Sequence, residues 1–495
     1  MLEQSRAPLF DALRRYVSEG VIPFHVPGHK QGRVGDGAFN DFVGNPVLSI
    51  DLTCLEELDH LSSPRSVILE AEQLAAEAFH ADHAFFLCNG SSIAIQAMIL
   101  ASCSPGDKIL VPRNAHKSVI AGIILSGAEP IYIQPVINDY LGIAMGITTE
   151  GVAEAITNHP DAVALFVINP TYYGVTSDLQ KITDLAHHHG LMVLVDEAHG
   201  GHFYFHEEMP LTAMAAGADM AAVSTHKLTG SLTQTALLLL REHEKLGRAR
   251  LRTVINLLQT TSPSYLLMAS QDTARREMAL HGHTLVTKAL EVARWLRQEL
   301  KEENGLYIFG DDIKGSPGCF NYDPTKLALC CRALGISGYE VDKILRQECR
   351  VQVELSDFYN ALAIVTIGDD MQTAHQLRDA MRYLVQNYNT RTLHNVEGSM
   401  PPIPQLIVSP RFAYYSETVA VPLEEAEGEI SAELAMAYPP GIPVICPGER
   451  ISWDIIRYIQ TMREANLNVQ GTEDPEINQI RVLRRNLTRV YSKEK

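Results

Sequence analysis

Lys227 follows directly on a short apolar run, in the sequence Ser224-Thr225-His226-Lys227. Apolar runs usually end in turn residues, so a lysine in this place is unusual. At the end of a strand in an α/β sheet, its side chain can project into the crevice where ligands bind. Loss of water there lowers the pKa of a lysine amine and makes it a nucleophile toward aldehydes. The alternative is an ordinary surface lysine after an edge strand.

Asp196 ends another apolar run, LMVLVD. Pyridoxal phosphate chemistry requires a carboxylate against the pyridine nitrogen, because the protonated ring is the better electron acceptor. The tetrad DEAH at 196–199 also matches a motif of nucleotide-hydrolysing helicases, but the chain has no G-x-x-x-x-G-K-[ST] phosphate loop. Together, Lys227 and Asp196 favour pyridoxal 5'-phosphate as the cofactor.

A phosphate site is indicated by Gly90, Ser91 and Ser92, which lie between the apolar run AFFLC and the helical pattern IAIQAMILASC. A Gly-Ser-Ser turn at a helix N-terminus offers backbone N–H groups, hydroxyls and the positive end of the helix dipole. Simple N-capping by either serine is the alternative. His116 follows the run KILVP, where an imidazole could stack on a flat ring and relay protons, or could be a solvated loop residue.

The other histidines do not indicate a metal site. The run at 187–189 lies near the end of a predicted helix, where the side chains diverge and favour the helix dipole. His202 and His206 have i, i+4 spacing but lack the H-E-x-x-H pattern. We therefore expect no metal.

Composition excludes several classes of protein. The chain has 495 residues, and its net charge of −18 opposes binding to nucleic-acid phosphates. No stretch is long and apolar enough to span a membrane, and the N-terminus lacks the apolar core of a signal peptide. The eight cysteines show no C-x-x-C spacing and mostly lie in apolar runs, as reduced thiols do. We expect a cytoplasmic protein.

The elements that must position these residues alternate between short apolar runs and helix-length segments from about residue 60 to 300. The runs are compact and bounded by Gly, Pro, Asn or Asp, which predicts strands buried on both faces of a mostly parallel sheet. A helix over 176–190 is predicted to be capped by Thr176 or Ser177 and to end at Gly190. The predicted strands are 84–89, 108–112, 130–136, 162–169, 191–196, 220–225 and 236–240.

Several domains are expected, because one hydrophobic core rarely supports a chain of this length. RVQVEL and ALAIVTIG predict strands of a small α+β domain, and the proline-rich stretch 398–410 predicts a linker. The predicted parts are an N-terminal segment (1–60), a large α/β domain (61–300), the small α+β domain (301–397), the linker (398–410) and a C-terminal domain (411–495).

With these sites in hand, the chain resembles the Orn/Lys/Arg decarboxylase family from about residue 7 to 460. It resembles the short form, because the family's N-terminal wing domain does not precede the first motif. The motifs that carry the resemblance are HVPGHKQG (25–32), DLTCLEELDHL (51–61), EAEQLAAEAFHADHAFFLCNGSS (70–92), PRNAHKS (112–118), DEAHGGH (196–202), STHKLTGSLTQT (224–235), VELSDFYNALAIVTIG (353–368) and YPPGIPVICPGE (438–449).

The resemblance implies an aspartate-aminotransferase-like fold (fold type I), with the large domain binding pyridoxal phosphate. Lys227 resembles the lysine that forms a Schiff base with the cofactor, Asp196 the partner of the pyridine nitrogen, and His116 the histidine stacked on the ring. The remaining positions it implies are Ser91, Ser92, Ser224 and His226 around the phosphate, Ala198 under the ring, Thr260 reaching in from a neighbouring subunit, and Glu354 and Tyr438 at the substrate.

The implied reaction is decarboxylation of a basic amino acid, with Lys227 or His226 returning a proton to Cα. Glu354 would pair with the cationic end of the substrate. Asp357 would either join it there or, as the simpler role, cap its own loop. We expect arginine, converted to agmatine in polyamine biosynthesis, with lysine (to cadaverine) or ornithine (to putrescine) as alternatives. The borrowed threonine implies a homodimer or a higher homo-oligomer. A transaminase or aldol-cleaving enzyme of the same fold, and a non-catalytic regulatory protein that retains it, are the competing interpretations.

Overall fold

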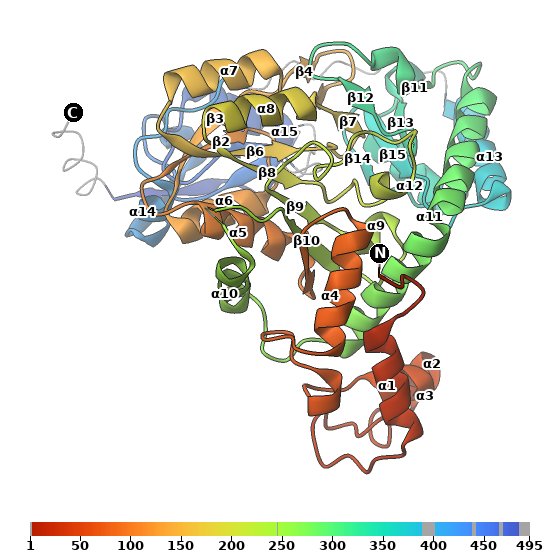
Figure 1. The fold of residues 1–495 in the computed structure, drawn as a ribbon. Coiled ribbons are helices and arrows are strands. Elements are labelled where there is room, and N and C mark those ends of the chain that lie inside the picture. The colour runs from red at the N-terminus through yellow and green to blue at the C-terminus, as the bar shows by residue number, and fades with distance from the viewer. Residues whose placement is uncertain (1, 245, 389–400, 438–441, 465–468, 485–495) are drawn as a thin grey trace. The chain divides into compact units, whose positions relative to one another are not determined.

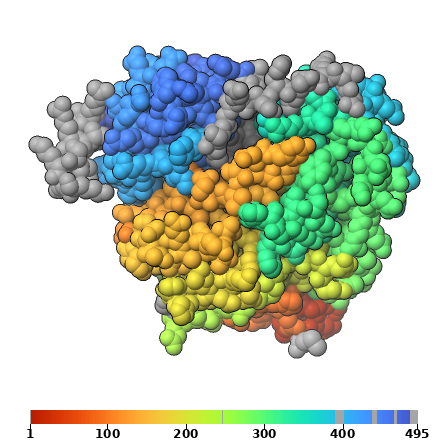
Figure 2. Space-filling model, turned by 90° about the horizontal axis from the view of Figure 1, so that it is seen from above, coloured from red at the N-terminus to blue at the C-terminus, as the bar shows by residue number. Residues whose placement is uncertain are grey.

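A computed structural model describes residues 2–244, 246–388, 401–437, 442–464 and 469–484, which are coloured in Figure 1 and Figure 2. The chain divides into two compact units. Unit 1 comprises Met1–Ala101, Val193–Ala289 and Thr366–Gly368, and unit 2 comprises Ser102–Met192, Leu290–Val365 and Asp369–Lys495. Both units are discontinuous in sequence, because the chain passes from one to the other several times.

Unit 1 contains four strands in the order β1-β10-β9-β8. β9 pairs parallel with β8, whereas β10 pairs antiparallel with both β9 and β1. The strands are β1 (His83–Leu87), β8 (Met192–Asp196), β9 (Met220–Val223) and β10 (Ala236–Leu240). The helices are α1 (Pro8–Ser18), α2 (Gly37–Val43), α3 (Asn45–Ile50), η1 (Glu56–Leu58), α4 (Val67–Ala78), α5 (Gly90–Ser102), η2 (Phe203–Phe205), α9 (Thr225–Leu228), α10 (Arg248–Leu258) and, as far as Ala289, α11 (Tyr265–Leu300).

The first part of unit 2 contains three parallel strands in the order β6-β2-β3 and the helices that connect or follow them in the sequence. The strands are β2 (Lys108–Pro112), β3 (Glu129–Ile133) and β6 (Ala162–Ile168), with the short strands β4 (Ile137–Asn138), β5 (Ile143–Ala144) and β7 (Val175–Thr176). The helices are α6 (Lys117–Ser126), α7 (Thr149–Asn158) and α8 (Leu179–His188).

A small antiparallel sheet of unit 2 has the order β11-β13-β15-β14. Leu141 and Ile143 share an apolar cluster with Phe309 and Tyr322, and the corresponding segments lie side by side in Figure 2. The elements are β11 (Tyr307–Phe309), η3 (Asp311–Ile313), β12 (Asn321–Tyr322), β13 (Lys326–Cys330), η4 (Arg332–Leu334), α12 (Gly338–Glu348), β14 (Leu355–Ser356), β15 (Asn360–Ile364) and α13 (Met371–Tyr388).

The C-terminal part of unit 2 has its own apolar core, in which α15 contributes Ile455, Ile456 and Ile459. β16 pairs with β20, and β17 lies between β18 and β19. The elements are α14 (Pro410–Tyr415), β16 (Thr418–Pro422), η5 (Leu423–Glu425), β17 (Ala435–Ala437), β18 (Ile442–Ile445), α15 (Trp453–Glu464), β19 (Val469–Gln470) and β20 (Gln479–Leu483).

The seven strands predicted between residues 84 and 240 are all present, with ends that differ by up to three residues. The predicted cap of the helix over 176–190 is wrong. Asp178 is the N-cap of α8, and its side chain accepts a hydrogen bond from the backbone N–H of Lys181. An aspartate outcompetes the two preceding hydroxyls here because its carboxylate also interacts favourably with the helix dipole.

In the part of the chain that the structure describes, no helix is long and apolar enough to cross a membrane. All eight cysteines are free thiols, and six of them are buried. The predicted boundaries between the N-terminal segment, the large, small and C-terminal domains and the linker stay predictions.

Candidate active site

Lys227 lies in the one-turn helix α9, immediately after the fully buried strand β9. Its side chain is half-buried, and Nζ lies 2.8 Å from Nε2 of His199. The end of a buried strand therefore holds the amine inside unit 1 and next to a polar partner.

Asp196 is the last residue of β8 and lies opposite Ala222 of the parallel strand β9. Figure 1 shows these two strands side by side. Burial raises the pKa of Asp196, while the positive charge of Lys227 and the backbone N–H of Ala198, 3.1 Å from Oδ1, act in the opposite direction. The structure thus brings Asp196 and Lys227 within electrostatic reach of each other, and a further cation beside this carboxylate would lower its pKa.

The loop after β8 is held close to β9. Ala198 is 7% exposed, and a Cβ added at Gly201 would come within 3.1 Å of Val223 Cγ1. Glu197 is fully buried and accepts hydrogen bonds from the Tyr204 hydroxyl (2.5 Å) and the backbone N–H of Ala213 (2.8 Å). These contacts fix the backbone on either side of Ala198.

The predicted phosphate-binding residues of unit 1 lie at two helix starts. α5 begins at Gly90, whose φ of +72° suits glycine, and Ser91 and Ser92 occupy its first turn. Ser224 precedes α9 and is 1% exposed, yet its hydroxyl has no hydrogen-bond partner among the described residues. A buried hydroxyl without a partner is costly, and a phosphate oxygen would satisfy it. The residues present therefore fit a phosphate-bearing cofactor.

His226 is oriented by the loop that follows it. Its Nδ1 lies 2.8 Å from the carbonyl oxygen of Thr235, and because a carbonyl only accepts, Nδ1 carries the proton. In the neutral ring, Nε2 is then the acceptor. The hydroxyl of Thr235 also accepts from the Thr225 hydroxyl at 3.0 Å. This network sets the tautomer of a residue next to Lys227.

Thr260 lies just beyond the end of α10 and is exposed in the single chain. Its hydroxyl accepts a hydrogen bond from the backbone N–H of Ser262 at 3.1 Å. Because this hydroxyl is exposed on a surface loop, a second chain could reach it.

The remaining predicted residues belong to unit 2. His116 is the N-cap of α6, with Nδ1 2.8 Å from the Ser118 hydroxyl. Glu354 is exposed. Asp357 accepts from the Tyr173 hydroxyl and from the backbone N–H groups of Tyr359 and Asn360, which are the contacts of a loop-capping residue. Tyr438 lies outside the described residues.

Two residues near Lys227 were not among the predicted site residues. His199 contacts the lysine amine, and Thr235 holds His226. The motif DEAH could have pointed to His199, because this histidine lies only three residues after Asp196 in the sequence. Thr235 carries no such signal, since its carbonyl rather than its side chain makes the contact.

Comparisons with known sequences indicate one family over nearly the whole chain. The family model "Orn/Lys/Arg decarboxylase, major domain" matches residues 7–373, and the model of the C-terminal domain of the same family matches residues 401–482. An arginine decarboxylase of Bacillus subtilis is 47% identical, covering 98% of this chain and 99% of that protein. An arginine decarboxylase of Halalkalibacterium halodurans is 46% identical over the same shares. The inducible lysine decarboxylase of Escherichia coli is 26% identical and is covered over 78% of its length.

Solved structures support the fold. A lysine decarboxylase of Francisella novicida superposes with a TM-score of 0.84 at 24% identity, covering 97% of this chain and 81% of that one. An alanine–glyoxylate aminotransferase of Nostoc matches with a TM-score of 0.53 at 16% identity over 66% of this chain. The predicted α/β fold of the pyridoxal-dependent decarboxylases and aminotransferases is therefore confirmed.

Proposed function

We propose, from the premise that this chain belongs to the Orn/Lys/Arg decarboxylase family, that it binds pyridoxal 5'-phosphate at Lys227 and releases carbon dioxide from arginine. The chain is a decarboxylase of that family. The observation that carries the proposed site is the half-buried amine of Lys227 at the end of β9, in electrostatic contact with the buried carboxylate of Asp196. Such a pair is what a cofactor with an aldehyde and a basic ring nitrogen requires.

When bound, the cofactor supplies an electron-accepting ring for the bond that breaks at Cα. Asp196 keeps a proton on the ring nitrogen, because a buried carboxylate without a cation beside it is costly. The Lys227 amine would hold the cofactor and return a proton to Cα. His226 could be the alternative donor only with a doubly protonated ring, because in the neutral ring its one proton lies on Nδ1 and is bound to the Thr235 carbonyl. Ser224 holds the phosphate with the first turn of α5, where Gly90, Ser91 and Ser92 lie, and Ala198 leaves room against the ring.

The substrate assignment follows the relatives that are 45–47% identical and are named arginine decarboxylases. An exposed carboxylate such as that of Glu354 can pair with a guanidinium in two parallel hydrogen bonds. We propose that Glu354 receives the cationic end of the substrate, that Tyr438 also contacts the substrate, and that His116 stacks on the cofactor. Thr260 would serve the site of a second chain, so a homodimer or a larger homo-oligomer is proposed.

The test is release of labelled carbon dioxide from carboxyl-labelled arginine, lysine and ornithine by the purified, cofactor-loaded protein. We expect arginine to give the highest kcat/KM. Lys227→Ala should lower the rate by several orders of magnitude and abolish the visible absorption band that borohydride bleaches. Lys343→Ala, which removes an exposed lysine of α12, is the matched control and should change neither. Full activity of Lys227→Ala would refute the site, and no carbon dioxide from any of the three substrates would refute the proposed function.

A further inference from the structure

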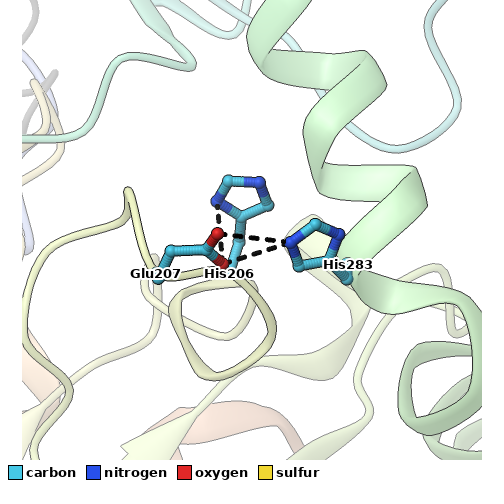
Figure 3. Close-up of side chains that lie close together, drawn as sticks. All are labelled: His206, Glu207 and His283. Carbon is cyan, nitrogen blue, oxygen red and sulfur yellow. Dashed lines mark hydrogen bonds and ion pairs between the residues drawn. The ribbon is translucent and has the colours of Figure 1, made fainter.

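Three potential metal ligands lie together in unit 1, and none of them is among the residues proposed for catalysis. His206 and Glu207 follow the short helix η2, and His283 lies in α11. One ligand atom from each lies within 4.8 Å of the other two. Figure 3 shows the carboxylate of Glu207 beside both imidazole rings, with His206 Nδ1 at 4.0 Å and His283 Nε2 at 3.1 Å from Oε2.

A glycine brings the two segments together. A Cβ added at Gly282 would lie 2.9 Å from Cβ of Phe205, which is closer than real Cβ contacts allow. Because this position is glycine, α11 can approach the loop after η2, and the next residue, His283, comes to lie beside His206. The two rings stack with centroids 4.5 Å apart and an angle of 22° between their planes.

The hydrogen bonds of His206 determine which nitrogen can bind a metal. The Thr287 hydroxyl donates its proton to the carbonyl oxygen of His283 at 2.8 Å. Its oxygen is therefore an acceptor for Nε2–H of His206, 3.1 Å away. The lone pair of His206 is then on Nδ1, the nitrogen that faces Glu207. Metal-binding histidines are usually held in this way, with the second ring N–H donated to a protein group.

The solvent exposure of the ligands also suits a metal. His206 is fixed, since its side chain is 3% exposed, whereas the side chains of Glu207 and His283 are 75% and 64% exposed. Ligand atoms around Zn²⁺ lie about 3.4 Å apart in tetrahedral geometry. The three ligand atoms, now within 4.8 Å of one another, must therefore approach, and the exposed ring of His283 must turn out of its stack on His206 so that both nitrogen lone pairs point at one ion. The backbone N–H of Glu208 now donates to His206 Nδ1 at 3.2 Å, a long hydrogen bond that the metal would replace.

We propose that His206, Glu207 and His283 bind a divalent transition-metal ion, with Zn²⁺ the best match to two imidazole nitrogens and one carboxylate oxygen. Water completes the coordination. The ion joins the loop that continues from Asp196 and Glu197 to the long helix α11, and so acts as a structural link. This proposal does not depend on the proposed function.

The experiment uses the full-length, cofactor-loaded protein after removal of metals with a chelator and dialysis. Zn²⁺ binding is measured by titration calorimetry, and Co²⁺ binding by its visible absorption, which reports coordination geometry. We expect a bound ion whose Zn²⁺ dissociation constant rises at least tenfold in both Glu207→Gln and His283→Ala. Saturating Zn²⁺ should raise the Tm of the wild-type protein and should raise that of the two variants less.

His281→Ala is the matched control, because His281 is another exposed histidine of α11, one residue before Gly282. This variant should bind Zn²⁺ as the wild-type protein does. Equal Zn²⁺ and Co²⁺ binding by the wild-type protein, Glu207→Gln and His283→Ala would overturn the proposal. Absence of binding to the wild-type protein would also overturn it. The Tm of each metal-free variant shows whether the fold is retained, and Glu207→Gln decides if His283→Ala is unstable.

Discussion

At the scale of single residues, the proposed active site is distinguished by groups whose local contacts are incomplete or costly within one chain. Ser224 is buried without a hydrogen-bond partner among the described residues, and Asp196 is buried with its pKa raised. Such groups lower stability in the absence of a ligand and become favourable when a ligand with phosphate oxygens and a cationic nitrogen is present. The same residues therefore lower the stability of the cofactor-free protein and contribute to the affinity for the cofactor.

Ser224→Ala should separate these two effects. In the cofactor-free protein, the substitution removes a buried hydroxyl that has no partner among the residues that the structure describes, so the free energy of unfolding should stay constant or rise by about 1 kcal/mol. In the cofactor-bound protein, it removes a hydrogen bond to a charged phosphate, so the cofactor should bind about tenfold or more weakly. Urea denaturation of the cofactor-free protein and cofactor titration by absorbance measure the two quantities.

Thr225→Val is the contrasting variant, because the Thr225 hydroxyl does have a partner in Thr235, at 3.0 Å. It should lower the free energy of unfolding of the cofactor-free protein by about 1 kcal/mol. If Ser224→Ala destabilised the cofactor-free protein by as much, or left cofactor affinity unchanged, the assignment of Ser224 to the phosphate would fail.

Glu197, in the loop after β8, should make the free energy of unfolding depend on pH. Burial raises the pKa of Glu197 to about 8, and the hydrogen bonds from Tyr204 and Ala213 oppose this only in part. Because the folded state then holds the proton more tightly than the unfolded state, the contribution of Glu197 to stability is complete below about pH 4.5. It is lost as the pH rises toward about 8, by up to about 1.4 kcal/mol per pH unit.

Glu197→Gln should therefore flatten the pH dependence of stability between about pH 5 and 8, because glutamine is neutral throughout and can still pair with Tyr204 and Ala213. The measurement is the free energy of unfolding from urea denaturation at several pH values. Glu154→Gln, a change at an exposed position of α7, should leave the profile unchanged. Parallel profiles for the wild-type protein and Glu197→Gln would show that the carboxyl does not titrate in this range.

At the scale of secondary-structure elements, sequence patterns predicted the strands that carry the site. Buried runs such as MVLVD and MAAV are short, apolar and bounded by polar residues, so the positions of Asp196 and Lys227 at the strand ends could be predicted. Strand direction could not, because β10 is fully buried like its neighbours yet runs antiparallel to β9. Periodicity reports burial, and direction depends on the connection between strands.

Elements of the small antiparallel sheet of unit 2 were predicted less well. The strands β11 and β13 were not predicted, and RVQVEL was expected to be a strand but contributes only Leu355 to β14. β11 is three residues long, which is too short for a pattern to stand out from a loop. The contacts between His206 and His283 were also out of reach of the sequence, because they depend on the close approach of α11 at Gly282.

At the scale of the molecule, a buried ion pair inside unit 2 joins the family's major domain, residues 7–373, to its C-terminal domain, residues 401–482. Arg113, just after β2, belongs to the stretch matched by the major domain, and Glu449 to the stretch matched by the C-terminal domain. Their Nη1–Oε1 and Nη2–Oε2 distances are 2.5 and 2.9 Å, and the side chains are 3% and 0% exposed. Arg113 also donates to the Val444 carbonyl, and Glu449 accepts from the Cys446 backbone N–H.

This geometry predicts a marked asymmetry between breaking the pair and replacing it. Arg113→Met or Glu449→Leu alone leaves one charge buried without its partner, and each should lower the free energy of unfolding by about 3–5 kcal/mol. The double variant removes both charges and should cost clearly less than the sum of the single changes. Arg484→Met is the matched control, because Arg484 forms an exposed ion pair with Glu417 and should contribute at most about 1 kcal/mol.

Urea denaturation of the wild-type protein, the two single variants and the double variant gives the coupling energy between Arg113 and Glu449. Limited proteolysis shows which part of the chain opens first. If the pair joins the C-terminal part to the strand that precedes His116, the single variants should become sensitive to protease within residues 401–482 before the rest of the chain unfolds. Additive losses in the double variant would mean that each side chain acts through its other contacts. The direct charge interaction between Arg113 and Glu449 would then not be what joins the two parts.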